Sequence, residues 1–102
     1  MKENLIGQAS PEQVEAWKRE HKAVYSVKVD GHIGYLRKPT RVDLSYAQST
    51  CKGDAIGYSE AILRNCWLGG SEAIKEDDEL FLGVSAQLDK LVQIKSAELE
   101  QL

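Results

Sequence analysis

Apolar residues recur along this chain at helical spacings in some segments and alternate with polar residues in others. The first helical pattern begins at Ser10 and Pro11, because serine can cap a helix and proline suits the first helical position. The face expected to pack on the core follows at spacings of three and four residues: Val14, Trp17 and His21. This pattern predicts a first helix from Pro11 to about Lys22.

A β-hairpin is predicted to follow this helix. Residues 23–29 and 32–38 are rich in β-branched and aromatic side chains, and Asp30-Gly31 between them is a strong signal for a two-residue turn. An isolated hairpin is only marginally stable in water. Helices are therefore expected to cover its apolar face.

A type I′ turn at this position decides which side chains share a face of the hairpin. It places Val29 opposite His32, and successive pairs then alternate between the two faces. The face expected to be buried carries Ala23, Tyr25, Val27, Val29, Gly34 and Leu36. The face expected to be wet carries Ser26, Lys28, Tyr35 and Arg37, with Val24 and Ile33 as apolar exceptions.

More helices are predicted after Pro39, which ends the second strand. One spans about 40–52 and begins with a capping threonine, and another spans 55–68 and ends at Gly69-Gly70. Residues 71–76 are expected to add one turn. The apolar residues of the two longer helices are Val42, Leu44, Ala47 and Cys51 in the first and Ile62, Leu63, Cys66 and Trp67 in the second.

The last predicted helix is the longest element. The acidic residues 77–79 begin it, where a helix favours negative charge, and apolar residues then recur at helical spacings as far as Leu102. Such a helix would be roughly 33 Å long, about the width of the whole domain, so its end is expected to project. The residues expected to bind another protein there are Leu91, Val92, Leu99 and Leu102. The alternative is that the whole helix packs on its own domain.

The 102 residues suit one domain, which we expect over residues 10–102. Residues 1–9 are expected to be a loose leader, or at most a short segment packed through Leu5 and Ile6. Hydrophobic residues form 42% and charged residues 28% of the chain, which is typical of a folded globular protein. The expected fold class is α+β, with one antiparallel β-hairpin packed against about four α-helices and a long C-terminal helix.

Charge and hydropathy narrow the classes of partner. The net charge is −3 and the basic residues are scattered among acidic ones, which argues against binding to nucleic acid. No apolar run approaches the roughly 20 residues needed to cross a bilayer. We therefore expect a cytoplasmic protein that binds other proteins rather than nucleic acid or membrane.

Candidate catalytic and metal-binding residues form no recognised motif. Cys66 with His21 or His32 could build a nucleophile, but Cys66 lies in the apolar stripe of its helix. The spacing of Cys51, Cys66 and the two histidines fits no zinc site, and the acidic residues 76–79 lack the order of a calcium loop. We therefore expect no enzymatic activity, no cofactor and no metal, with both cysteines as buried thiols.

Three short sequence segments lie at characteristic positions in this order of predicted elements. They are YLRKP at 35–39, which ends the hairpin, NCWLGG at 65–70, which ends a helix, and Asp77-Asp78, which opens the last helix. This arrangement resembles the small tail assembly chaperones of long-tailed phages and prophages. The similarity covers most of residues 11–102.

The resemblance implies a non-enzymatic protein that binds the tape-measure protein in the bacterial host cell and keeps that long chain soluble. It implies no cofactor, displacement as tail subunits assemble, and often a longer product made by ribosomal frameshifting. Apart from the resemblance, the apolar stripe of the last helix leaves self-association into a homo-oligomer through Leu91, Val92, Leu99 and Leu102 open as an alternative to packing on its own domain. An alternative is a bacterial adaptor or regulatory domain unrelated to phage, and a third interpretation is a small enzyme that uses Cys66.

Overall fold

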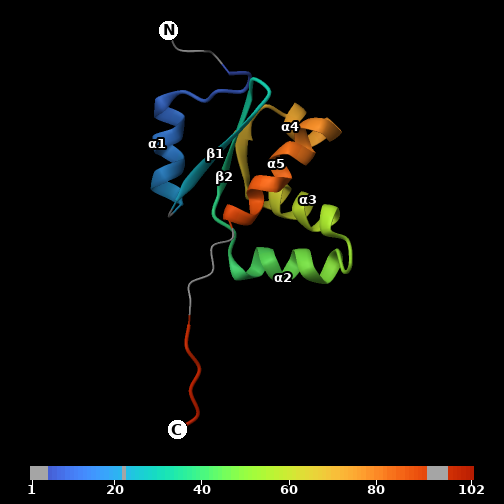
Figure 1. The fold of residues 1–102 in the computed structure, drawn as a ribbon. Helices are drawn as coiled ribbons and strands as arrows, with labels where there is room; N and C mark the ends of the chain where they lie inside the picture. The colour runs from blue at the N-terminus through green and yellow to red at the C-terminus, as the bar shows by residue number, and fades with distance from the viewer. Residues whose placement is uncertain (1–4, 22, 92–96) are drawn as a thin grey trace.

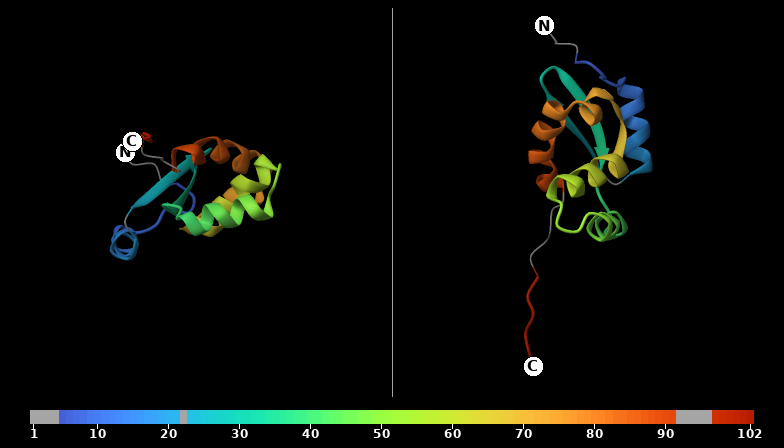
Figure 2. Two further views of the ribbon diagram at one scale, coloured as in Figure 1. Left: turned by 90° about the horizontal axis from the view of Figure 1, so that it is seen from below. Right: turned by 90° about the vertical axis from the view of Figure 1, so that its right-hand side faces the viewer.

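The computed structural model describes residues 5–21, 23–91 and 97–102 of the chain. In chain order its elements are α1 (Pro11–Glu20), β1 (Val24–Val29), β2 (His32–Arg37), α2 (Arg41–Thr50), α3 (Ala55–Cys66), β3 (Trp67–Gly70), α4 (Ala73–Glu76) and α5 (Asp78–Leu91). The three strands form one antiparallel sheet in the order β1-β2-β3 (Figure 1). Figure 2 shows α1 and α5 on opposite sides of this sheet. The fold class is therefore α+β, as the sequence predicts.

The predicted hairpin is confirmed in its turn and in its register. Asp30 and Gly31 have φ angles of 46° and 79°, the two positive values that a type I′ turn requires. Val29 pairs with His32, and the ladder continues through the predicted partners Tyr25 and Leu36. The face assignment for Leu36 follows from this register, and Leu36 is fully buried.

The core lies on the Leu36 face of the sheet, between the sheet and the helices α3, α4 and α5. Its buried members come from one strand and four helices: Leu36, Ala47, Ile62, Leu63, Cys66, Ile74, Phe81, Val84, Leu88 and Leu91. Tyr25, Val27 and Val29 of β1 are partly buried against this cluster. The alternation along the hairpin therefore identifies the face that builds the core.

A third strand replaces the predicted end of α3. The helix stops at Cys66, and Trp67–Gly70 pairs with β2, so the prediction of a helix to Leu68 with a glycine terminator was wrong. Gly70 has φ of 126°, and a Cβ there would lie 2.5 Å from the carbonyl oxygen of Ile33. The glycine is needed for a close approach between strands, which the sequence pattern does not distinguish from a helix end.

The second face of the sheet is not the wet surface that the alternation predicts. Ile33 and Tyr35 are buried, and the ring of Trp17 from α1 lies against the Tyr35 ring, with 5.2 Å between centroids. The prediction failed for β2 because α1 returns over this face, whereas Ser26 and Lys28 of β1 remain exposed as predicted. α1 itself has no fully buried residue, and its Trp17 ring lies close to both Tyr35 of β2 and Gly69 of β3.

Residues 5–9 are attached to the sheet through the backbone. The amide of Ile6 donates to the carbonyl of Gly31 at 2.9 Å, and the amide of Ile33 donates to the carbonyl of Ile6 at 3.0 Å. The amide of Ala9 donates to the hydroxyl of Tyr35 at 3.1 Å. The Ile6 side chain is exposed and Leu5 is only partly buried, so the segment is held by these hydrogen bonds with little buried apolar surface.

The last helix begins as predicted but is shorter than predicted. A side-chain oxygen of Asp77 accepts from the amide of Leu80 at 3.1 Å, which is the capping role expected for the acidic run. α5 ends at Leu91 in the described residues, and residues 97–102 are not helical, so the prediction of a helix to Leu102 was wrong. Leu99 and Leu102 make no packed face with the core, and a helix without tertiary packing is marginal in water.

Candidate protein-binding surface

Two apolar side chains one turn apart on α2 face solvent. Val42 is 76% exposed and Tyr46 is 55% exposed, and we call this pair the α2 ridge. A hollow of about 500 Å³ on the surface is lined by Arg41, Val42, Ser45 and Tyr46. A second hollow of about 260 Å³ is lined by Arg37, Val42, Asp43, Tyr46 and Asn65. The α2 ridge therefore lies beside two shallow, open depressions of the surface.

The sequence pattern includes Val42 among the apolar residues of α2 but does not reveal its exposure. Asp43 and Ala47 are buried instead, and Val42 and Tyr46 each lie one residue earlier, about 100° around the helix. A ten-residue helix on the edge of the domain buries only one face. The inward position of Asp43 sets the rotation of α2, and Asp43 turns inward to meet Arg37 of β2, a partner that the pattern within the helix does not reveal.

An ion pair holds α2 in this orientation. Nη1 of Arg37 donates to Oδ2 of Asp43 at 2.7 Å, and Nη2 of Arg37 donates to Oδ1 at 3.0 Å. Nη2 also donates to the backbone carbonyl of Asn65 on α3 at 2.9 Å. Oδ2 of Asp43 accepts from the amide of Thr40 at 2.8 Å, which completes the capping box. The pair thus joins β2, α2 and α3 beside the α2 ridge.

The charges of this ion pair are stabilised in the folded chain. Hydrogen bonds from Arg37 are the largest cause that lowers the pKa of Asp43 to about 2, and the amide of Thr40 adds to the effect. The same hydrogen bond raises the pKa of Arg37 above its ordinary value. Asp43 is therefore ionised at neutral pH, and its negative charge is balanced by Arg37. Arg41 carries the only exposed charge among the residues of α2.

The four residues predicted to bind protein do not form one surface. Leu91 is 5% exposed and belongs to the core, so its predicted role as an exposed contact was wrong. Val92 lies outside the described residues. Leu99 and Leu102 are fully exposed in the C-terminal segment, by which we mean residues 97–102. Of the described residues predicted to bind protein, Leu99 and Leu102 therefore remain candidates for an exposed apolar contact.

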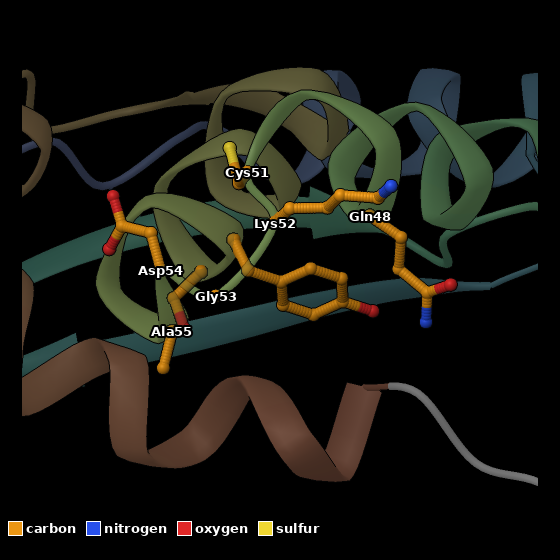
Figure 3. A pocket seen from close by; sticks show the side chains of 8 residues that line it. Gln48, Cys51, Lys52, Gly53, Asp54 and Ala55 are labelled. Carbon is orange, nitrogen blue, oxygen red and sulfur yellow. The ribbon is translucent and has the colours of Figure 1, made fainter.

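A further depression lies at the connection between α2 and α3 (Figure 3). It has a volume of about 760 Å³ and is lined by Gln48, Cys51, Lys52, Gly53, Asp54, Ala55, Tyr58 and Ser59. The side chains of Lys52 and Asp54 extend to opposite sides of it in Figure 3. Oδ1 of Asp54 accepts from the amide of Gly57 at 2.9 Å, so this carboxylate serves as a helix cap. Lys52 and Asp54 therefore do not converge on one ligand position in this depression.

The cysteines and histidine considered for catalysis lie in surroundings that favour a structural role over a catalytic one. Cys66 is fully buried, and burial raises the pKa of its thiol to about 11, so the nucleophilic thiolate is scarce at neutral pH. Nδ1 of His32 is 2.8 Å from the hydroxyl of Ser71, and Ser71 is buried. Cys51 is partly exposed, contrary to the prediction of two buried thiols, and both cysteines are free.

Metal-binding and membrane-spanning features are likewise not found in the part of the chain that the structure describes. Within residues 5–21, 23–91 and 97–102, no three of the His, Cys, Asp and Glu side chains gather as metal ligands would. None of the helices in these ranges has the length and apolar character of a membrane span. No family model matches the chain, and neither a curated protein nor a solved structure matches it.

Proposed function

We propose that this protein is a non-enzymatic, protein-binding protein that acts through exposed apolar side chains. The observation that carries the proposal is the C-terminal segment, in which Leu99 and Leu102 are fully exposed beside the acidic Glu98 and Glu100. Two leucines in six solvated residues gain free energy when a partner covers them. The α2 ridge adds a second apolar surface on the folded domain.

We further propose that the partner is a phage or prophage tape-measure protein, bound during tail assembly in the bacterial cytoplasm. The support is the resemblance in the order of elements, together with the hairpin that ends in Arg37-Lys38-Pro39 and the acidic start of α5. A chaperone for a long, partly apolar chain needs exposed apolar surface more than a polar pocket. The alternative is an adaptor of the bacterial host that captures one folded protein through the same surfaces.

The C-terminal segment can be altered without disturbing the core, which makes a direct test possible. A chain with Leu99→Ser and Leu102→Ser is expected to keep the stability of the parent because neither side chain contacts the core cluster. Co-expressed with a tape-measure protein encoded beside its gene, it should leave most of that protein insoluble. Parent chain and the control Gln101→Ala should keep the tape-measure protein soluble and co-purify with it.

The outcome separates the proposed function from its alternatives. Equal solubilisation by the double variant and the parent would contradict a role for this segment in binding. Several copies of the chain per tape-measure protein, found by mass of the purified complex, would support the chaperone. A one-to-one complex with a folded host protein, and none with the tape-measure protein, would support the adaptor instead.

A further inference from the structure

Among the apolar side chains that face solvent in the described residues, two sets come in pairs, and the chemistry of the two pairs is complementary. One is the α2 ridge, and the other is the C-terminal segment with Leu99 and Leu102. In Figure 1 the segment extends away from the folded domain, past the end of the molecule where α2 lies. An apolar side chain on one surface could therefore be covered by the other surface of a second molecule.

Charge favours this match. The C-terminal segment carries Glu98 and Glu100 and no basic residue. The ridge is bordered by the exposed Arg41, while the carboxylate of Asp43 is already neutralised by Arg37. The segment is thus acidic and the surface around the ridge is basic, so their approach is attractive and that attraction weakens with salt.

Shape favours it as well. Leu99 and Leu102 are three residues apart, and residues at that spacing share one face when a segment takes up a helical turn on binding. The ridge offers hollows of about 500 Å³ and about 260 Å³ beside Val42 and Tyr46. Two leucines from one face of a turn can therefore lie against Val42 and Tyr46, as side chains do where two helices pack.

We propose that the α2 ridge of one copy of this chain binds the C-terminal segment of a second copy. The inference rests on the proposed role of Leu99 and Leu102 in binding protein, and it adds a second partner for the same segment. Two copies that exchange segments reciprocally form a closed dimer, whereas one-way exchange forms a chain of copies. Self-association and capture of a client then compete for the same leucines.

A mixing experiment with purified protein tests this proposal. One variant carries Val42→Ser and Tyr46→Ser and keeps its C-terminal segment, and the other lacks residues 97–102 and keeps its ridge. Each variant alone should sediment at the mass of its own monomer, whereas an equimolar mixture should form a one-to-one complex. The parent chain should gain mass with concentration, and Ile56→Ser, at a similarly exposed position on α3, should behave as the parent.

Charge reversal provides a second measurement. Arg41→Glu should weaken self-association several-fold, and Glu98→Arg with Glu100→Arg on the other molecule should recover most of that loss. Circular dichroism of each variant checks that the fold is retained. A parent chain that stays monomeric at high concentration, or a mixture that stays monomeric, would overturn the proposal. The experiment contains no tape-measure protein, so its result is independent of whether the proposed client binds.

Discussion

The two faces of β2 are held to the rest of the molecule by different kinds of interaction. On one face, Leu36 belongs to a cluster of apolar side chains that includes residues of α3, α4 and α5, and it has no exposed surface. On the other face, Tyr35 meets the Trp17 ring and receives a hydrogen bond, and Arg37 forms an ion pair with Asp43. Leu36 therefore belongs to the apolar core, whereas its neighbours Tyr35 and Arg37 are held by a ring contact, a hydrogen bond and an ion pair.

This difference has a consequence for how the two faces respond to solution conditions. Apolar packing depends on buried area and is insensitive to pH and to moderate salt. The contacts on the Tyr35 face depend on geometry and on the ionisation of one carboxyl group. Substitutions and acid should therefore affect the two faces to different extents.

Leu36→Ala should give the largest loss. The substitution removes a fully buried side chain and leaves a cavity beneath three helices, so we expect it to lower the free energy of unfolding by roughly 2–4 kcal/mol. Urea denaturation at pH 7 measures this loss. Lys28→Ala is the control on exposed β1 surface, with an expected loss under about 0.5 kcal/mol. Equal losses in the two variants would mean that the core does not lie on the Leu36 face.

Asp43→Asn should cost roughly 2 kcal/mol at neutral pH because it removes the charge that Arg37 binds. Folding lowers the pKa of Asp43 to about 2, from an ordinary value of 3.8, so on acidification the unfolded chain takes up this proton first. The stabilisation is fully present above about pH 4 and is lost as the pH falls through about 2. The parent and the variant should therefore converge in stability over this range, as measured by urea melts at several pH values.

Asp54→Asn is the matched control for that comparison. Asp54 also caps a helix through its side chain, but it is exposed, and asparagine caps a helix about as well as aspartate. Its free energy of unfolding should stay within about 0.5 kcal/mol of that of the parent. A gap between Asp43→Asn and the parent that persists unchanged at pH 2 would show that the ion pair is not the source of the loss.

Trp17→Ala should have a smaller and more local effect, of roughly 1–2 kcal/mol. The side chain is only partly buried, but it provides the aromatic contact with Tyr35. Amide hydrogen exchange should show α1 losing protection while β1 and β2 keep theirs, because α1 has no buried residue of its own. Loss of protection across the whole sheet would mean that the two faces fold as one unit.

Local signals in the sequence predict the hairpin well. Asp30-Gly31 specifies a type I′ turn, and the turn alone determines the register and therefore the inward position of Leu36. The helix starts at Ser10, Thr40 and Asp54 are likewise local, since each capping oxygen accepts an amide three residues later. Features whose cause lies within a few residues can be read from the chain.

Features that depend on distant partners could not be predicted in this way. Trp67–Gly70 is a strand because β2 has an open edge beside it, and Tyr35 is buried because α1 returns over it. The α2 ridge is exposed because Asp43 turns inward to meet Arg37 from another element. Leu91 belongs to the core and Leu99 is exposed, so the core ends between these two residues. The periodic pattern of apolar residues continues past that point and does not mark it.

The placement of the two tryptophans gives this protein an optical signal for each face of its sheet. Trp17 lies against the Tyr35 face, and Trp67, the only other tryptophan, packs against the core cluster on the Leu36 face with Nζ of Lys75 4.8 Å from its ring centroid. Indole emission shifts when the ring becomes exposed to water. Replacing either tryptophan with phenylalanine therefore leaves a single indole, whose emission reports on one side of the molecule without any attached dye.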